Sequence, residues 1–330
     1  MKVWSLWQQF LDILWNRKCI DSLGKKMKKR SIFKASFEES LNLQDDPISG
    51  EFSNKNLASA QEKEKYRGTT KSYVWLTVLT IVFIIGPNWL ITTLTNYLYH
   101  HSEDSPLLPP VHNFLPNWLF IIFLLLWLLL ILFGKRFSQQ YILIYRGQFH
   151  MFVTFLIWLI VEMNLFLLTF LYSTIKATGA ILFFVLFGLM CCIFVRSRRT
   201  SLLSLLYGKQ EDEQDWLGRL FHRVAAFIFK YGFGIIVVLL IFRLIFPHAV
   251  GLMLDTLGVL LIWFVGDLLF VLLESFLIFP FMLQGYYKWK YPEEYREWEG
   301  KSIEEWYGKR YLKKHPELLQ KKIGNRTYDQ

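Results

Sequence analysis

The sequence predicts an all-α, polytopic integral membrane protein with about six transmembrane helices, an N-terminal interfacial amphipathic helix and a cytoplasmic helical tail. Two observations carry this prediction. Of the 330 residues, 53% are hydrophobic and 19% are charged, whereas a typical soluble domain is about 25% charged. The hydrophobic residues also gather in long blocks separated by polar segments, as in membrane-spanning helices. This composition excludes a disordered chain, a coiled coil and a small disulfide scaffold, and it disfavours an ordinary soluble enzyme.

Six apolar blocks are long enough to cross a bilayer, which takes about 20 residues of helix. The first contains Gly86 and Pro87, which predict a helix kink because proline removes a backbone hydrogen bond. The last block is longer than one span needs, and the alternative is two spans that turn at Gly266 and Asp267. The blocks cover residues 73–98, 117–133, 151–172, 178–195, 229–246 and 249–283.

The basic residues decide between these alternatives. With six spans and an internal N-terminus, all of the 37 Lys and Arg residues except Lys176 and Arg243 lie on one side of the membrane. Such residues are retained on the cytoplasmic side. Two spans in the last block would place the basic tail outside. We therefore expect one long last span, both termini in the cytoplasm and a multi-pass location in the cell membrane.

Four segments divide the chain. They are an interfacial amphipathic helix over residues 1–20, a flexible cytoplasmic linker over 21–72, a transmembrane domain over 73–283 and an aromatic, basic cytoplasmic tail over 284–330. In the tail, Ser302 and Glu305 have the spacing of a capping box, which predicts a helix start. That helix should end before Pro316. The tail either lies against the bilayer or docks a cytoplasmic partner, and the sequence favours neither.

The first segment should lie on the membrane surface. At helical spacing its apolar side chains share one face and its polar side chains the other, which is typical of an interfacial helix. A basic cluster follows it and should bind anionic lipid headgroups. The alternative is a helix that docks on another protein. The residues expected at the surface are Trp4, Trp7, Phe10, Trp15, Lys25, Lys26, Lys28, Lys29 and Arg30.

Four polar residues inside the apolar blocks form the candidate intramembrane site: Glu162, Asn164, Asp267 and Glu274. Ionisable groups at membrane depth are candidates for function by default. Glu162 and Asp267 should lie at similar depth on facing helices, where they would bind a cation or relay protons. The alternative is a structural role, through pairing with Arg243 or Lys230 or through contacts between helices.

Two functions remain open. The first is a non-enzymatic subunit or scaffold of a membrane assembly, for example in secretion, export or immunity, with a protein partner or as a homo-oligomer. The alternative is a channel or an ion- or proton-coupled transporter that uses the buried carboxylates. The net charge of +10 is explained by the membrane surface, so no nucleic-acid partner is expected. The sequence contains no motif that predicts a cofactor, a metal site or catalysis.

Overall fold

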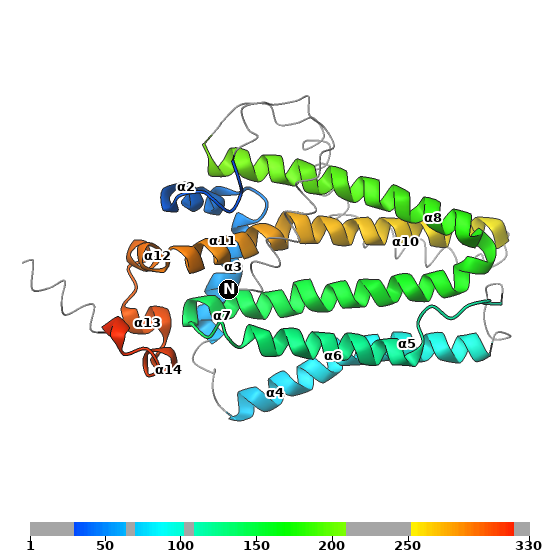
Figure 1. The fold of residues 1–330 in the computed structure, drawn as a ribbon, viewed down its shortest axis with the longest axis horizontal. Helices are drawn as coiled ribbons and strands as arrows, with labels where there is room; N and C mark the ends of the chain where they lie inside the picture. The colour runs from blue at the N-terminus through cyan, green and yellow to red at the C-terminus, as the bar shows by residue number, and fades with distance from the viewer. Residues whose placement is uncertain (1–29, 64–69, 102–108, 209–251, 320–330) are drawn as a thin grey trace, which may run out of the picture.

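A computed structural model describes residues 30–63, 70–101, 109–208 and 252–319, and these residues form helices and connecting turns without a strand (Figure 1). The α-helices are α2 (Phe37–Leu41), α3 (Gly50–Lys63), α4 (Thr70–Thr80), α5 (Gly86–His100), α6 (Asn117–Gly134), α7 (Gln140–Gln148), α8 (Leu156–Leu206), α10 (Leu252–Leu273), α11 (Phe279–Lys290), α12 (Pro292–Trp298), α13 (Ile303–Tyr307) and α14 (Lys309–Leu312). One 3-10 turn, η1 (Asn42–Asp45), and three π-helical segments, η3 (Ile81–Ile85), η5 (Phe149–Phe155) and η6 (Glu274–Ile278), join or extend them.

Within the described residues, four continuous helical stretches are long and apolar enough to cross a membrane. They are Thr77–His100, Asn117–Gly134, Gln140–Leu206 and Leu257–Lys290. For the described residues this confirms a helical protein with helices able to span a membrane, and each stretch overlaps one or two of the predicted apolar blocks. The predicted block 229–246 lies outside the described residues, so the count of six spans stays a prediction.

The third stretch reverses direction at Lys176. This residue has φ 54° and ψ −177°, the one non-helical conformation recorded inside α8. Figure 1 shows that α8 folds back at this point into two antiparallel legs. The predicted blocks 151–172 and 178–195 fall on the first and second leg, respectively. The last predicted block, by contrast, passes through Gly266 and Asp267 as unbroken helix, so the alternative with a turn there is wrong.

The helix axis changes direction around the predicted kink. The π-helical segment η3 ends directly before Gly86, and Pro87 stands in the first turn of α5. Figure 1 shows α4 inclined to α5. A proline ring inside an α-helix clashes with the carbonyl four residues earlier, here that of Phe83, and it also donates no hydrogen bond. The wider π turn provides the space that this ring needs.

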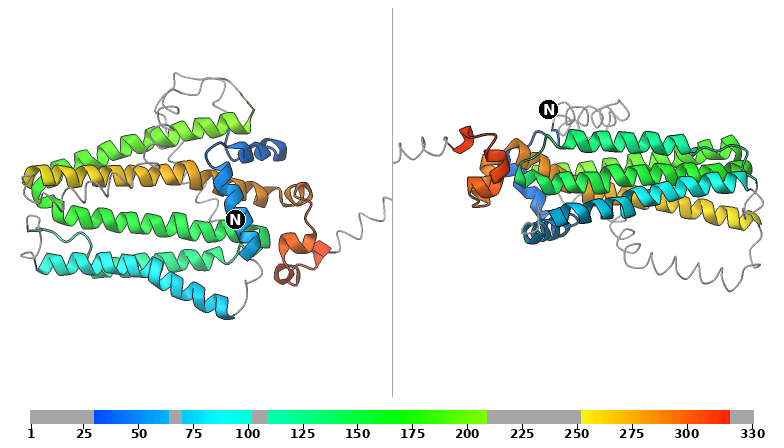
Figure 2. Two further views of the ribbon diagram at one scale, coloured as in Figure 1. Left: turned by 180° about the vertical axis from the view of Figure 1, so that it is seen from behind. Right: turned by 90° about the horizontal axis from the view of Figure 1, so that it is seen from below.

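One end of the bundle carries a compact helical unit, which we call the head. It consists of the segment 30–63, the last turns of α8, and α11 to α14 (Figure 1). The two further views in Figure 2 place these segments at the same end. The opposite end, where Lys176 lies, is called the far end. The buried centre of the head includes Leu43, Leu202 and Tyr287.

The expectation of a flexible linker over residues 21–72 is wrong for residues 30–63. Ser36 and Glu39 form a capping box that starts α2, and Ile32, Ala35 and Leu43 are buried in the head. These apolar side chains are few and lie in a polar stretch, so the composition of the segment conceals them. Their burial against distant parts of the chain offsets the entropic cost of ordering the segment.

The predicted capping box of Ser302 and Glu305 is confirmed at the start of α13. The helix ends before Pro316, as predicted, but earlier than the proline requires: its last residue is Tyr307, and Gly308 is its C-cap. Gly308 has φ 82°, and a Cβ atom there would stand 2.5 Å from Gln140 Oε1. Both the backbone conformation and the close approach require glycine. The short helix α14 follows this break.

Candidate functional site

The structure brings two of the four predicted intramembrane residues together. Asn164 Nδ2, on the first leg of α8, donates a hydrogen bond of 2.9 Å to Asp267 Oδ1 on α10. Trp263 Nε1, one turn before Asp267, donates to Asn164 Oδ1 at 2.9 Å. The Trp263 ring stacks on Phe183 of the second leg, with 4.1 Å between the ring centroids. This contact therefore joins both legs of α8 to α10.

Glu162 does not take part in this contact. Asn164 follows Glu162 by two positions, which corresponds to about 200° around a helix, so the two side chains point to nearly opposite sides. Glu162 is fully buried, and its Oε1 accepts a hydrogen bond of 2.6 Å from Trp158 Nε1. Trp158 packs against Phe120 and Trp127 of α6. Glu162 and Asp267 therefore do not share a site. Asp267 contacts the face of α8 that carries Asn164, whereas Glu162 lies on the opposite face.

Glu274 lies two turns beyond Asp267, at the start of η6, and is half-buried. Its Oε1 has no hydrogen-bond partner within the described part of the chain. The same holds for Glu162 Oε2 and Asp267 Oδ2. The predicted alternative partners Lys230 and Arg243 lie outside the described residues. Each of the three carboxylates therefore has one buried oxygen without a hydrogen-bond partner among the described residues.

Of the residues expected at the membrane surface, only Arg30 lies within the described residues. It is exposed, and its guanidinium lies 4.6 Å from the centre of the Tyr207 ring. The other expected residues, all in the first 29 positions, lie outside. Tyr207 OH also donates to the carbonyl of Ser31 at 2.9 Å. The chain is therefore fixed to the end of α8 where the head begins.

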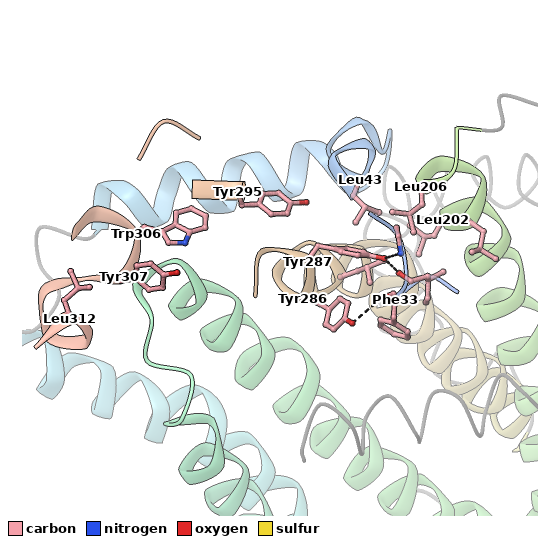
Figure 3. Close-up of a cluster of buried hydrophobic side chains, with 14 residues drawn as sticks. Phe33, Leu43, Leu202, Leu206, Tyr286, Tyr287, Tyr295, Trp306, Tyr307 and Leu312 are labelled. Atoms are coloured by element: carbon pink, nitrogen blue, oxygen red, sulfur yellow. Dashed lines mark hydrogen bonds between the residues drawn. The ribbon is translucent and has the colours of Figure 1, made fainter. Parts of the chain in front are cut away.

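The head contains a set of contacts that the sequence did not predict. A short segment that contains a turn, residues 31–35, is held by four side chains that we call the tyrosine cradle: Tyr207, Tyr286, Tyr287 and Tyr291. Tyr287 OH donates to the Ile32 carbonyl at 2.5 Å and accepts from the Ala35 amide at 3.1 Å. Tyr286 OH donates to the Phe33 carbonyl at 3.2 Å and Tyr291 OH to the Ala35 carbonyl at 2.9 Å. Figure 3 shows Tyr286 and Tyr287 pointing toward this segment from α11.

The cradle recognises main-chain atoms, so it fixes the position of the segment with little demand on side-chain identity. Lys290 Nζ adds hydrogen bonds to the carbonyls of Phe33 and Ala35, at 3.2 and 3.3 Å. The sequence gives a partial signal, because tyrosines and lysines alternate after residue 285. Such a pattern is also typical of an interfacial anchor where a helix leaves the membrane. The acceptors are more than 250 residues away along the chain, and no local pattern reveals them.

Two ion pairs are buried around the head. Arg198 Nη2 lies 2.5 Å from Asp46 Oδ2, and Lys288 Nζ lies 2.6 Å from Glu299 Oε1. Lys301 also reaches Glu299, at 2.8 Å. Burial by itself raises the pKa of the Glu299 carboxyl, but the ammonium groups of Lys288 and Lys301 outweigh burial and hold this pKa below its ordinary value. Glu299 is therefore an anion at neutral pH, as its two partners require.

Comparison with known proteins adds no functional information. No protein-family model, curated protein or solved structure matches this chain.

Proposed function

We propose that this protein is a non-enzymatic subunit or scaffold of a membrane assembly, and that its head is the surface on which the assembly is built. One observation carries the proposal: the segment 31–35, which precedes the spans, folds in a single head with the end of the last membrane-capable stretch, α11, and with α12 to α14, which follow it. The tyrosine cradle holds this union through main-chain hydrogen bonds. A fixed unit of this kind suits docking better than two loose tails.

The connection between head and bundle supports the same role. The last stretch continues as helix from α10 through η6 into α11, so the head has no flexible joint to it. The Arg198–Asp46 pair joins the second leg of α8 to the segment before α3. On the head surface, Trp298 is 52% exposed. An exposed tryptophan is a common anchor of protein interfaces.

We place the head in the cytoplasm of a cell-membrane protein with six spans. The asymmetry of Lys and Arg along the sequence supports this orientation. The basic cluster that ends at Arg30 then faces the anionic lipid of the same leaflet. Both termini lie on that side in this arrangement.

Site-specific photo-crosslinking in the native membrane tests the scaffold proposal. A photoreactive residue at position 298 should crosslink to one defined protein, or to a second copy, in a product of constant size. The same residue at Trp118, which is 60% exposed on α6, is the control for contacts along the spans. Opening the cradle with Ile32→Asp should remove the crosslink at position 298. A chain that stays monomeric, with no discrete product from position 298, would contradict the proposal.

The second candidate function is a channel or an ion- or proton-coupled transporter. The contact of Asn164 with Asp267 at the meeting of α8 and α10 favours it, because paired polar groups inside a bundle often line ion pathways. Reconstitution into vesicles decides between the two functions. Asp267→Asn should abolish flux in a transporter, whereas it should leave a scaffold intact and at normal levels in the membrane.

A further inference from the structure

A row of buried side chains on η3 and α5 faces the first leg of α8. Ile84, Asn88, Thr92 and Thr95 follow one another at helical spacing, and each is more than nine-tenths buried. The packing of α5 on α8 covers this row. Three of its four members are polar, which is costly inside an apolar bundle unless the polar atoms have partners.

Two contacts set the register between α5 and the first leg of α8. Near the head, Ile84 packs in one cluster with Trp158. Toward the far end, Asn96 Nδ2 donates to the Leu115 carbonyl at 3.1 Å, and the preceding amide, of Phe114, donates to Thr169 Oγ1 at 3.1 Å. Ile84 therefore lies at about the same height along the bundle as Trp158, and Asn96 lies at about the same height as Thr169. Both helices run toward the far end.

This register places Glu162 beside the polar row. Both helices rise by about 1.5 Å per residue, so Glu162 lies at a level between Asn88 and Thr92. Glu162 follows Trp158 by one turn and shares its face, and Trp158 is in the cluster that contains Ile84. Glu162 is fully buried. The register therefore places the three side chains at about the same level, where the two helices pack.

Each of these side chains keeps one oxygen without a hydrogen-bond partner in the described part of the chain: Asn88 Oδ1, Thr92 Oγ1 and Glu162 Oε2. Two neighbouring donor atoms already have acceptors. Asn88 Nδ2 donates to the Ile84 carbonyl at 2.8 Å, and Trp158 Nε1 donates to the other oxygen of Glu162 at 2.6 Å. What remains is a group of oxygens with a single carboxylate, which is a set of ligands for a hard cation.

A cavity reaches one member of this group, Thr92. It has a volume of about 600 Å³ and lies between α5 and α6, with Thr92, Asn96, Asn117 and Phe120 among its lining residues. Thr92 belongs both to the cavity wall and to the buried row. Phe120 packs on Trp158, with 5.7 Å between the ring centroids. The wall of the cavity therefore includes one member of the buried row, Thr92, and Phe120, which packs on the hydrogen-bond donor of Glu162.

We propose that Asn88, Thr92 and Glu162 bind one monovalent metal cation, which enters through the cavity between α5 and α6. One carboxylate balances one positive charge, whereas a divalent ion would leave an excess charge buried in apolar surroundings at a large cost. The site lies on the face of α8 opposite the one that carries Asn164 and contacts Asp267 of α10. It is independent of the scaffold proposal, since the ion can stabilise the bundle of a subunit that transports nothing.

The test measures cation binding by the purified full-length protein in detergent. Na⁺ and K⁺ are the probes, and N-methylglucamine chloride keeps the ionic strength constant. The melting temperature should rise with one of the two cations and saturate, because a ligand bound only by the folded state stabilises it. Radioactive Na⁺, or Rb⁺ in place of K⁺, should bind at a ratio of about one per chain.

Thr92→Val and Glu162→Gln should weaken this binding on the order of tenfold or more, a loss that removal of even a supporting residue of a metal site can cause. Thr92→Val keeps the shape of the side chain, so it decides the outcome if Glu162→Gln does not fold. Thr93→Val is the matched control, because Thr93 lines the same cavity but is exposed; it should bind like the unchanged protein.

Three results would overturn the proposal. The first is a folded protein whose melting temperature responds to neither cation and which binds no radioactive ion. The second is a response that Thr92→Val and Glu162→Gln leave unchanged. The third is a melting temperature that depends on pH through Glu162 but not on Na⁺ or K⁺, which would assign a shared proton to these oxygens.

Discussion

The guanidinium of Arg198 holds the carboxylate of Asp46 with two hydrogen bonds, from Nη1 to Oδ1 at 3.2 Å and from Nη2 to Oδ2 at 2.5 Å. Both side chains are almost completely buried. The amide of Ser49 donates to Asp46 Oδ2 at 2.8 Å, and its hydroxyl donates to the same oxygen. Arg198 Nη2 also donates to the Phe276 carbonyl at 3.3 Å. The pair therefore connects the segment before α3, the second leg of α8 and η6.

Removing one member of this pair should destabilise the protein strongly. Asp46→Ala leaves the Arg198 guanidinium buried without its counter-charge, which costs about 3–5 kcal/mol. Chemical unfolding in detergent measures this cost. The double variant Asp46→Leu, Arg198→Met should lose less than the single variant, because no charge stays buried.

The control for this prediction is the exposed pair of Lys55 and Glu51, whose side chains are 75% and 77% exposed. Glu51→Ala should change the free energy of unfolding by less than about 1 kcal/mol. An Asp46→Ala variant no less stable than Glu51→Ala would show that the buried pair contributes little.

The head should lose stability in acid through Glu299. Its pKa in the folded protein lies below the ordinary value, so its contribution is complete above about pH 4.3, the ordinary Glu pKa. The contribution is lost as the pH falls from there through the lowered pKa, because the unfolded chain binds the proton first. Fluorescence of the buried Trp306 measures the unfolding. Glu299→Gln should flatten this part of the pH dependence, whereas Glu304→Gln, on the surface of α13, should retain it.

The cradle hydroxyls should hold the segment 31–35 in place. Tyr287→Phe removes one hydrogen bond to the Ile32 carbonyl and one from the Ala35 amide, and leaves buried backbone groups unsatisfied at a cost of about 1–3 kcal/mol. Hydrogen exchange of the Ala35 amide should accelerate accordingly. The control is Tyr172→Phe, because the ring of Tyr172 packs on His112 and Phe114 but its hydroxyl makes no hydrogen bond within the described residues. Equal exchange in both variants would argue against the cradle.

The proposed orientation predicts which positions a membrane-impermeant thiol reagent labels in intact cells. Cysteines are placed at Ser105 and at Thr327 after Cys19, Cys191 and Cys192 have been replaced by alanine. Position 105 should be labelled from outside, and position 327 only after the membrane is opened. Labelling of position 327 in intact cells would rule out the six-span arrangement.

The N-terminal helix should bind membranes by itself. A peptide of residues 1–29 should bind vesicles with anionic lipid and gain helicity, because the apolar face and the basic cluster act together. Circular dichroism and vesicle sedimentation measure the two effects. Trp7→Asp with Phe10→Asp should abolish binding, and Gln8→Asp with Gln9→Asp, on the polar face, is the control. An unchanged peptide that stays unbound at low salt would assign this helix to a protein partner.

The elements that the sequence predicted well are those whose signal is local. The block 117–133 corresponds to α6 almost residue for residue, because an uninterrupted apolar run that begins directly after Pro116 predicts a spanning helix with a defined start. The head was missed for the opposite reason, since the partners of residues 31–35 lie at the other end of the chain. The split between Glu162 and Asn164 follows from helical geometry alone. The partner of Asn164 on α10 depends on packing that a single sequence does not contain.

The reversal at Lys176 has a mechanical consequence. One residue with positive φ connects the two legs of α8, and a connection this short contains no slack. The legs therefore cannot slide along each other without unwinding a turn of helix. The second leg is held to Asp46 through Arg198, whereas the first leg carries both Glu162 and Asn164. If the head moved, the two legs of α8 would therefore tilt together as one unit. The two polar faces of the first leg, with Glu162 and Asn164, would then change orientation together.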